Sequence, residues 1–229
     1  MTSGTAPATL PPPGLAGLDP AWSRLVTVSD LDGVGRTFHL LDNGVADPAM
    51  TLLCVHGNPS WSYLWRDLLA TAPPGVRVVA LDHLDMGFSE RTGTVRRLQD
   101  RIDDLGALTD VLGLTGPTVT VAHDWGGPIS LGWAERHRDQ LAGIVLANTA
   151  VHQPAGSPAP RLIRTARLPG VLDQVTVRTP AFIRGALEMS NPRPSADVRA
   201  AYHAPYRTAA QRAAIGTFVA DIPLDSDHP

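Results

Sequence analysis

The sequence predicts an α/β fold: a mostly parallel, doubly wound sheet with a helical cap inserted into it. Short apolar runs rich in β-branched residues alternate with longer segments of helical period over residues 25–149. This alternation is the pattern of a parallel sheet covered by helices on both faces. Beyond residue 150 the chain becomes rich in Pro, Gly and Ser and then has helical stretches without convincing strands, which indicates a cap.

Six segments have the composition of strands. Each is a short run of Val, Leu, Ile, Ala or Thr, and most end at a Gly, Asp or Asn that can start a turn. A parallel sheet buried on both faces needs near-continuous apolar strands of this kind. The expected strands are residues 25–30, 36–42, 50–57, 76–82, 118–124 and 141–149.

Helices are expected between these strands. In residues 96–114 the apolar side chains recur at spacings of three and four, which places them on one face of a helix that ends at Gly113. In the cap, residues 181–190, 195–203 and 208–222 have helical patterns. The first twenty residues are rich in Pro, Ala, Gly and Thr, so we expect residues 1–20 to be a disordered tail, followed by a core over 21–150 and the cap over 151–229.

Composition narrows the class of function. The net charge is −3 and no basic run occurs, which argues against a nucleic-acid or anionic-membrane partner and favours a small apolar organic substrate. No apolar stretch approaches the roughly 20 residues that span a bilayer. A single cysteine, Cys54, and the lack of a secretory signal predict a cytoplasmic protein. Neither a metal-ligand spacing nor a dinucleotide fingerprint occurs, so we expect no metal and no cofactor.

Three polar motifs follow predicted strands: "HGNPSWSYLW", "DHLDMGFSER" and "AHDWGG". Ligands of open α/β sheets bind beyond the carboxyl ends of the strands, so the three motifs are expected to line one crevice.

The third motif has the pattern of a nucleophile elbow, a sharp strand-to-helix turn, with Asp124 at the nucleophile position. Ala122 and Gly126 are small because the turn is tight, and Gly127 lets the helix approach the sheet. Asp124 would stand at a helix N-terminus, which favours an anion. A carboxylate is ionised near neutral pH and can attack an sp³ carbon that carries a leaving group, forming a covalent ester. The alternative is that Asp124 only closes a structural turn.

The first motif supplies the other half of an anion-stabilising site. His56 and Gly57 follow a buried strand and Asn58 lies at the turn. We interpret His56 as a structural hydrogen-bonding residue rather than a catalytic base. Trp125 could be only a core aromatic residue, although its indole N–H would then still need a partner.

The segments "HGNPSWSYLWRDLL", "DHLDMGFSER" and "AHDWGGPISLGWAERH" resemble the α/β-hydrolase superfamily, and within it the haloalkane dehalogenase-like group with an aspartate nucleophile. The resemblance covers roughly residues 25–229. It implies that Asp124 is the nucleophile, that Asn58 and Trp125 hold the departing halide, and that their backbone N–H groups stabilise charge on the ester.

The sequence also departs from this group. Ala122 stands where Gly is common, Asp85 stands where many relatives have Gly, and Asn148 stands where some dehalogenases carry their acid. The family pattern continues beyond the cap with strands that supply a carboxylate and a late histidine. The resemblance therefore predicts that the chain is truncated at its C-terminus, with these core elements missing, and that it can be alkylated at Asp124 but cannot turn over.

Four functions remain open at this point. The leading hypothesis is a hydrolase-fold enzyme that forms an ester with a small apolar electrophile, nearest to a haloalkane dehalogenase. A second hypothesis that the resemblance allows is a β-lactone decarboxylase of olefin biosynthesis. An epoxide hydrolase would need cap tyrosines, for which only Tyr202 and Tyr206 are candidates. A fourth alternative is a truncated non-catalytic remnant or binding module.

Overall fold

The computed structural model describes residues 4–114, 116–151, 161–168 and 170–224. Its centre is a six-stranded sheet with the order β1-β2-β4-β3-β5-β6. All six expected strands are confirmed. They are β1 (Ser23–Ser29), β2 (Gly35–Asp42), β3 (Met50–Val55), β4 (Val76–Leu81), β5 (Thr118–His123) and β6 (Leu141–Ala147).

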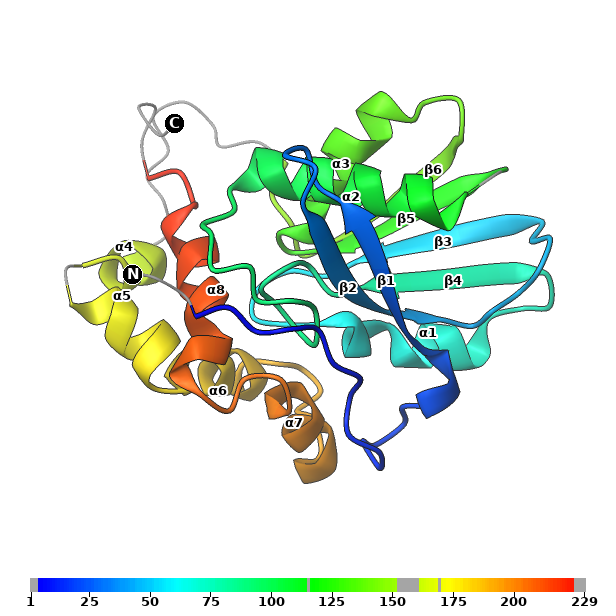
Figure 1. Cartoon of the computed structure of the whole chain (residues 1–229). Helices are drawn as coiled ribbons and strands as arrows, with labels where there is room; N and C mark the ends of the chain where they lie inside the picture. The colour runs from blue at the N-terminus through cyan, green and yellow to red at the C-terminus, as the bar shows by residue number, and fades with distance from the viewer. Residues whose placement is uncertain (1–3, 115, 152–160, 169, 225–229) are drawn as a thin grey trace.

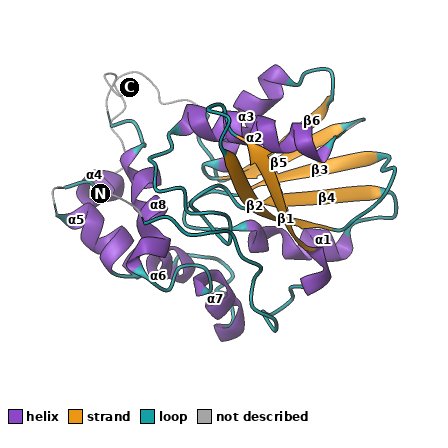
Figure 2. Ribbon diagram, in the orientation of Figure 1, coloured by secondary structure: helices purple, strands orange, loops and turns teal. Residues whose placement is uncertain are grey.

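The sheet is mostly parallel, as predicted. β3 lies at the centre and pairs in parallel with both β4 and β5, and β6 extends the parallel part at one edge. β1 and β2 form an antiparallel hairpin, and β2 is also antiparallel to β4. The carboxyl ends of β3, β4 and β5 therefore lie side by side at the same end of the strands, and the three polar motifs follow them there (Figure 2).

Helices cover both faces of the sheet (Figure 1). α1 (Arg66–Thr71) packs its Leu69 into a small apolar cluster with Cys54. α2 (Leu98–Leu112) and α3 (Gly126–Arg136) cover the other face, over the larger core cluster. α2 begins where the Arg97 N–H donates to the Asp100 carboxylate at 2.8 Å, and it ends at Gly113, whose φ of 57° needs the freedom of glycine.

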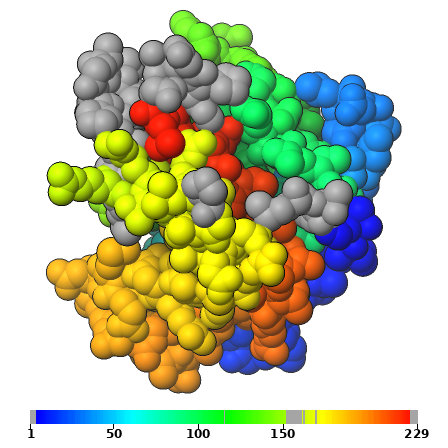
Figure 3. All heavy atoms as spheres, turned by 90° about the vertical axis from the view of Figure 1, so that its left-hand side faces the viewer, coloured from blue at the N-terminus to red at the C-terminus, as the bar shows by residue number. Residues whose placement is uncertain are grey.

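The chain beyond β6 is helical where it is described, as the sequence predicts. Helices α4–α8 lie together to one side of the sheet, and their atoms form much of the surface in the view turned by 90° (Figures 1 and 3). The expected cap segment at residues 152–160 lies outside the described residues. The elements are α4 (Arg161–Ala166), α5 (Val171–Asp173), the π-helical turn η3 (Gln174–Arg178), α6 (Ala181–Glu188), α7 (Ala196–His203) and α8 (Ala209–Ala220).

The N-terminal segment differs from the expected disordered tail. From residue 4 onward it runs along the protein, where Ala6 and Arg91 exchange backbone hydrogen bonds of 3.0 and 2.8 Å. Thr9 N–H donates to the carbonyl of Phe88 at 3.0 Å, and the Tyr63 hydroxyl donates to the carbonyl of Ala16. The segment is ordered because its backbone groups form hydrogen bonds to loops that the core already holds in place. Amino-acid composition gives no information about such hydrogen bonds to distant residues.

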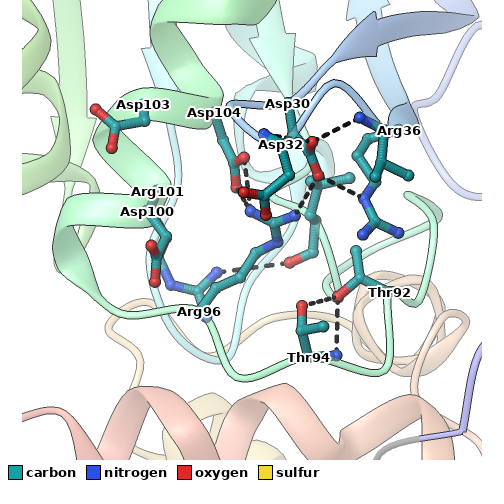
Figure 4. Close-up of polar contacts among 12 residues, drawn as sticks. Asp30, Asp32, Arg36, Thr92, Thr94, Arg96, Asp100, Arg101, Asp103 and Asp104 are labelled. Atoms are coloured by element: carbon teal, nitrogen blue, oxygen red, sulfur yellow. Dashed lines mark hydrogen bonds and ion pairs between the residues drawn. The ribbon is translucent and has the colours of Figure 1, made fainter.

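A cluster of charges joins the β1–β2 turn to α2 (Figure 4). The Arg96 guanidinium contacts both carboxylate oxygens of Asp104, at 2.8 and 3.0 Å, and lies 3.6 Å from Asp30. Arg36 Nε donates to the same carboxylate oxygen of Asp30 at 2.9 Å. Because Arg96 lies in the loop between β4 and α2, the cluster ties the end of that loop to the β1–β2 turn.

Candidate active site

Asp124 lies in the sharp turn between β5 and α3, with a φ of 53°. A non-glycine residue in this left-handed region costs about 1–3 kcal/mol and persists only where its surroundings hold it. Three hydrogen bonds hold it here: Asp124 N–H donates to Ala147 at 3.3 Å, while its carbonyl accepts from Gly127 N–H at 2.9 Å and from the Thr149 hydroxyl at 2.6 Å. The side chain is thereby fixed at the N-terminus of α3.

The glycines around Asp124 are needed for space. A Cβ at Gly57 would overlap the Asp124 side chain, and one at Gly126 would overlap the Val55 carbonyl of β3. A Cβ at Gly127 would overlap the side chain of Thr149, which follows β6, so the close approach of α3 needs a glycine at both positions. Ala122, the first small residue of the elbow, is fully buried.

Two backbone N–H groups point at the Asp124 carboxylate. Asn58 N–H donates to Oδ1 at 2.7 Å, and the Trp125 N–H donates to the same carboxylate. Burial raises the pKa of Asp124, whereas the two N–H donors and the nearby His123 oppose that rise. The arrangement stabilises negative charge at this point in a largely desolvated place, which is the requirement of an oxyanion hole.

The side chains of Asn58 and Trp125 face the cap. Asn58 Nδ2 donates to the carbonyl of Ile215 in α8 at 3.2 Å, and its Oδ1 is buried with no hydrogen-bond partner among the described residues. The Trp125 ring lies 5.6 Å from the ring of Phe218, also in α8. Helix α8 therefore covers the two side chains that the sequence nominated as anion-binding groups.

His56 is held as a neutral structural residue. Its Nε2 accepts the His83 N–H at 3.2 Å, so the ring proton lies on Nδ1 and is donated to the Gly57 carbonyl at 2.8 Å. His83 in turn donates from Nε2 to the His56 carbonyl at 2.9 Å. Burial lowers the pKa of both histidines, and the nearby His56 lowers the pKa of His83 further. Their contacts join the loops after β3 and β4.

Several groups of this site had no local signal in the sequence. Ile215 and Phe218 are ordinary apolar residues of a cap helix, and they meet Asn58 and Trp125 only because α8 folds back over the sheet. Thr149 could have been suspected, because it follows the carboxyl end of β6.

The two cap tyrosines are engaged elsewhere. Tyr206 donates to the Ser60 carbonyl at 2.6 Å and accepts the Gly87 N–H at 3.1 Å, while the Tyr202 hydroxyl lies beside Arg66. An epoxide hydrolase would need these hydroxyls to hold the epoxide oxygen, and here they are bonded to other groups of the protein, so the structure does not favour that alternative.

Asp85 is fixed by its own loop. Its φ of 68° lies in the left-handed region that glycine adopts most easily, which is why a glycine would suit this position. Its carboxylate accepts the Thr92 N–H at 2.6 Å. Asp85 is 5% exposed and lines a cavity of about 380 Å³. Small side chains of α8 and the η3 region form most of this cavity, which does not include Asp124, Asn58 or Trp125.

The described ranges of the chain contain no cluster of histidine, cysteine and carboxylate side chains suited to a metal ion. Within those same ranges, no helix has the length and hydrophobicity needed to cross a bilayer.

A family model described as "alpha/beta hydrolase fold" matches residues 51–180, more than half of the chain. The chain belongs to the α/β-hydrolase fold family. The match covers all of β3 except Met50, all of β4, β5 and β6, the turn at Asn58 and the elbow at Asp124.

Curated proteins of two kinds are similar to this α/β-hydrolase. A cis-3-alkyl-4-alkyloxetan-2-one decarboxylase of Xanthomonas campestris pv. campestris is 39% identical over 202 residues, covering 83% of this chain and 66% of the relative. Haloalkane dehalogenase 2 of Mycobacterium tuberculosis is 34% identical over 176 residues, covering 76% of this chain and 60% of the relative. The chain thus spans about six tenths to two thirds of the length of these relatives.

Solved structures agree with this placement. A putative ancestral haloalkane dehalogenase superposes with a TM-score of 0.78 at 25% identity, covering 89% of this chain and 71% of that one. The haloalkane dehalogenase of Paraglaciecola agarilytica superposes with a TM-score of 0.79 at 24% identity, covering 97% of this chain and 74% of that one, which shows the common fold.

Proposed function

We propose that this α/β-hydrolase uses Asp124 as a nucleophile toward a small apolar organic electrophile and forms a covalent ester with it. The observation that carries the proposal is the Asp124 carboxylate at a left-handed elbow, with the Asn58 N–H at 2.7 Å from Oδ1 and the Trp125 N–H as a second donor. A carboxylate fixed in this way needs no base to become nucleophilic. The same two N–H groups can then stabilise charge on the ester oxygen during a later step.

The first candidate substrate is a haloalkane. A carboxylate oxygen of Asp124 attacks the sp³ carbon, the carbon–halogen bond breaks, and the halide leaves with the bonding electrons. The second proton of Asn58 Nδ2 and the indole N–H of Trp125 are the donors proposed for that halide. Helix α8 lies over both side chains and would shield the leaving group from water.

The second candidate is a cis-3,4-dialkyloxetan-2-one, favoured by the 39% identity with a decarboxylase of such lactones. Asp124 would attack the ring carbon that bears the lactone oxygen, and the strained ring would open to an ester carrying a free carboxylate. Loss of carbon dioxide then supplies the electron pair of the new double bond and expels the Asp124 carboxylate. This sequence returns the enzyme without water.

The two candidates differ in their need for a base. Hydrolysis of the ester left by a haloalkane requires an activated water, whereas lactone decarboxylation does not. No hydrogen bond of a described histidine reaches Asp124, and the rings of His56 and His83 are bound to backbone groups. On the described residues alone, the lactone is therefore the substrate for which more than one turnover is expected.

The experiment exposes the 229-residue chain separately to a 1-bromoalkane and to a cis-3,4-dialkyloxetan-2-one. Intact mass and peptide mapping should locate an alkyl ester at Asp124, and D124N should remain unmodified. Bromide and alkene are measured in the same samples. An adduct elsewhere, or equal modification of D124N, would remove Asp124 as the nucleophile, while the ratio of product to protein separates the two substrates.

Domain division and location form part of the same proposal. Residues 21–150 would be the catalytic core, and the helices between residues 161 and 220 a cap that selects the substrate. We place the reaction in the cytoplasm because the buried thiol of Cys54 is free.

A further inference from the structure

The turn that carries Asn58 is tied to the cap at three points. Asn58 Nδ2 bonds to the Ile215 carbonyl of α8 at 3.2 Å, and Trp61 Nε1 donates to the Ala201 carbonyl of α7 at 3.2 Å. The shortest of the three bonds runs from the Tyr206 hydroxyl, between α7 and α8, to the Ser60 carbonyl at 2.6 Å.

The hydroxyl of Tyr206 joins two loops. It has one proton, which it donates to Ser60, and it accepts the N–H of Gly87 at 3.1 Å. Ser60 belongs to the loop after β3 and Gly87 to the loop after β4. Tyr206 is 1% exposed, and burial raises the pKa of its hydroxyl, so the proton stays in place across the working pH range. Without this hydroxyl, the partly buried Ser60 carbonyl and the buried Gly87 N–H would each lose a partner.

A short series of contacts links Ser60 to Asp124. Ser60 N–H donates to the Gly57 carbonyl at 2.9 Å and closes a tight turn, and the Asn58 N–H inside that turn donates to Asp124. Gly57 itself lies against the Asp124 side chain, so the turn has little room to shift without moving this donor.

We propose that Tyr206 is a positioning residue, whose hydroxyl fixes the Gly57–Ser60 turn so that the Asn58 N–H stays aimed at the Asp124 carboxylate. Its effect on reaction rate rests on the proposed function of Asp124, but its effect on geometry does not. The cap thereby sets the strength of an oxyanion donor in the core, in addition to covering the site.

The test is Tyr206→Phe, which keeps the ring and removes the hydroxyl. The Asn58 N–H holds the pKa of Asp124 down, so a misaligned donor should raise it. Carbon-13 NMR of labelled aspartate, assigned with D124N, should show the Asp124 midpoint rising by about half a pH unit or more, a roughly threefold gain in proton affinity. Tyr202→Phe is the matched control, because it also removes a cap phenol hydroxyl but one that lies beside Arg66.

A rescue experiment separates positioning from stability. 4-Aminophenylalanine at position 206 retains a donor and should restore the wild-type midpoint, while 4-methylphenylalanine fills the space without one and should behave as phenylalanine does. The methyl variant also decides the matter if Tyr206→Phe leaves a cavity that prevents folding. An unchanged Asp124 midpoint in the folded variants lacking a donor would overturn the proposal.

Alkylation rates connect the result to the proposed function. With a 1-bromoalkane, the limiting rate of ester formation should fall about three- to tenfold in Tyr206→Phe, with an unchanged half-saturating concentration. If the midpoint moves but even the wild-type chain is never alkylated, Tyr206 retains its positioning role and the proposed nucleophile is wrong.

Discussion

Gly57 lies directly against the carboxylate of Asp124. The two residues are far apart in the chain, since Asn58, which follows Gly57, and Asp124 differ by 66 positions. A single added methyl group at Gly57 would overlap both the Asp124 side chain and the Trp125 N–H. The absence of a side chain at Gly57 is therefore part of the geometry that directs two N–H groups at one carboxylate.

Gly57→Ala should lower the rate of Asp124 alkylation by about a hundredfold or more, because it displaces an oxyanion donor and the nucleophile together. Time-resolved intact mass after mixing with a 1-bromoalkane measures this rate. Gly185→Ala, in α6, is the matched control, since a Cβ there meets no atom within 4 Å and alanine favours the helix. Alkylation of Gly57→Ala at the control rate would show that the turn adapts freely.

Bromide should stabilise the protein through the indole of Trp125. We expect a rise in the thermal midpoint as bromide is titrated, and its loss in Trp125→Phe, which keeps an aromatic ring against Phe218 but removes the N–H. Trp65→Phe removes a buried indole N–H that has no described partner, so it should keep the bromide response. A response that survives in Trp125→Phe would place the anion elsewhere.

Stability should fall as the pH drops below about 6.5 because of the His56–His83 pair. Burial lowers the pKa of both rings in the folded protein below the ordinary value of 6.5, so the unfolded chain binds protons first. Their contribution is complete above pH 6.5 and is lost as the pH falls toward the folded values. The free energy of unfolding in urea at pH 7.5, 6.5 and 5.5 measures this loss.

His83→Gln isolates that contribution, because glutamine can keep a donor toward the His56 carbonyl and does not titrate. We expect the variant to lose less stability between pH 6.5 and 5.5, by up to about 1.4 kcal/mol. Parallel curves for the wild type and the variant would mean that other groups control the acid limb.

Strand β6 should cause self-association of this chain. It is the edge of the described sheet, and Ile144, Val145 and Leu146 are 41%, 50% and 41% exposed. An exposed apolar edge offers unpaired backbone groups to another strand. Val145→Lys should reduce the high-mass fraction in light scattering, whereas Val111→Lys, at an equally exposed site on α2, should not.

The strands, the elbow and its neighbours could be predicted from the sequence because their signals are local. An apolar run marks a buried strand, and a tight turn needs small residues at fixed offsets from Asp124, whatever the rest of the chain does. The prediction for the N-terminal segment was wrong because it also used only local information. Composition shows how much apolar surface a segment can bury by itself, whereas Ala6 and Thr9 are held by backbone hydrogen bonds to the distant Arg91 and Phe88.

By itself, the sequence determined the parallel sheet, the carboxylate at the elbow and the tight turn at Asn58. Only the tertiary structure decided what surrounds them. No motif marks the cap residues that contact the site: Ile215 contacts Asn58, Phe218 contacts Trp125, and Tyr206 contacts Ser60. These contacts exist because α8 and the turn before it fold back over the carboxyl ends of the strands. Contacts between residues that are distant in the chain depend on how helices pack, and no short pattern of residues encodes that packing.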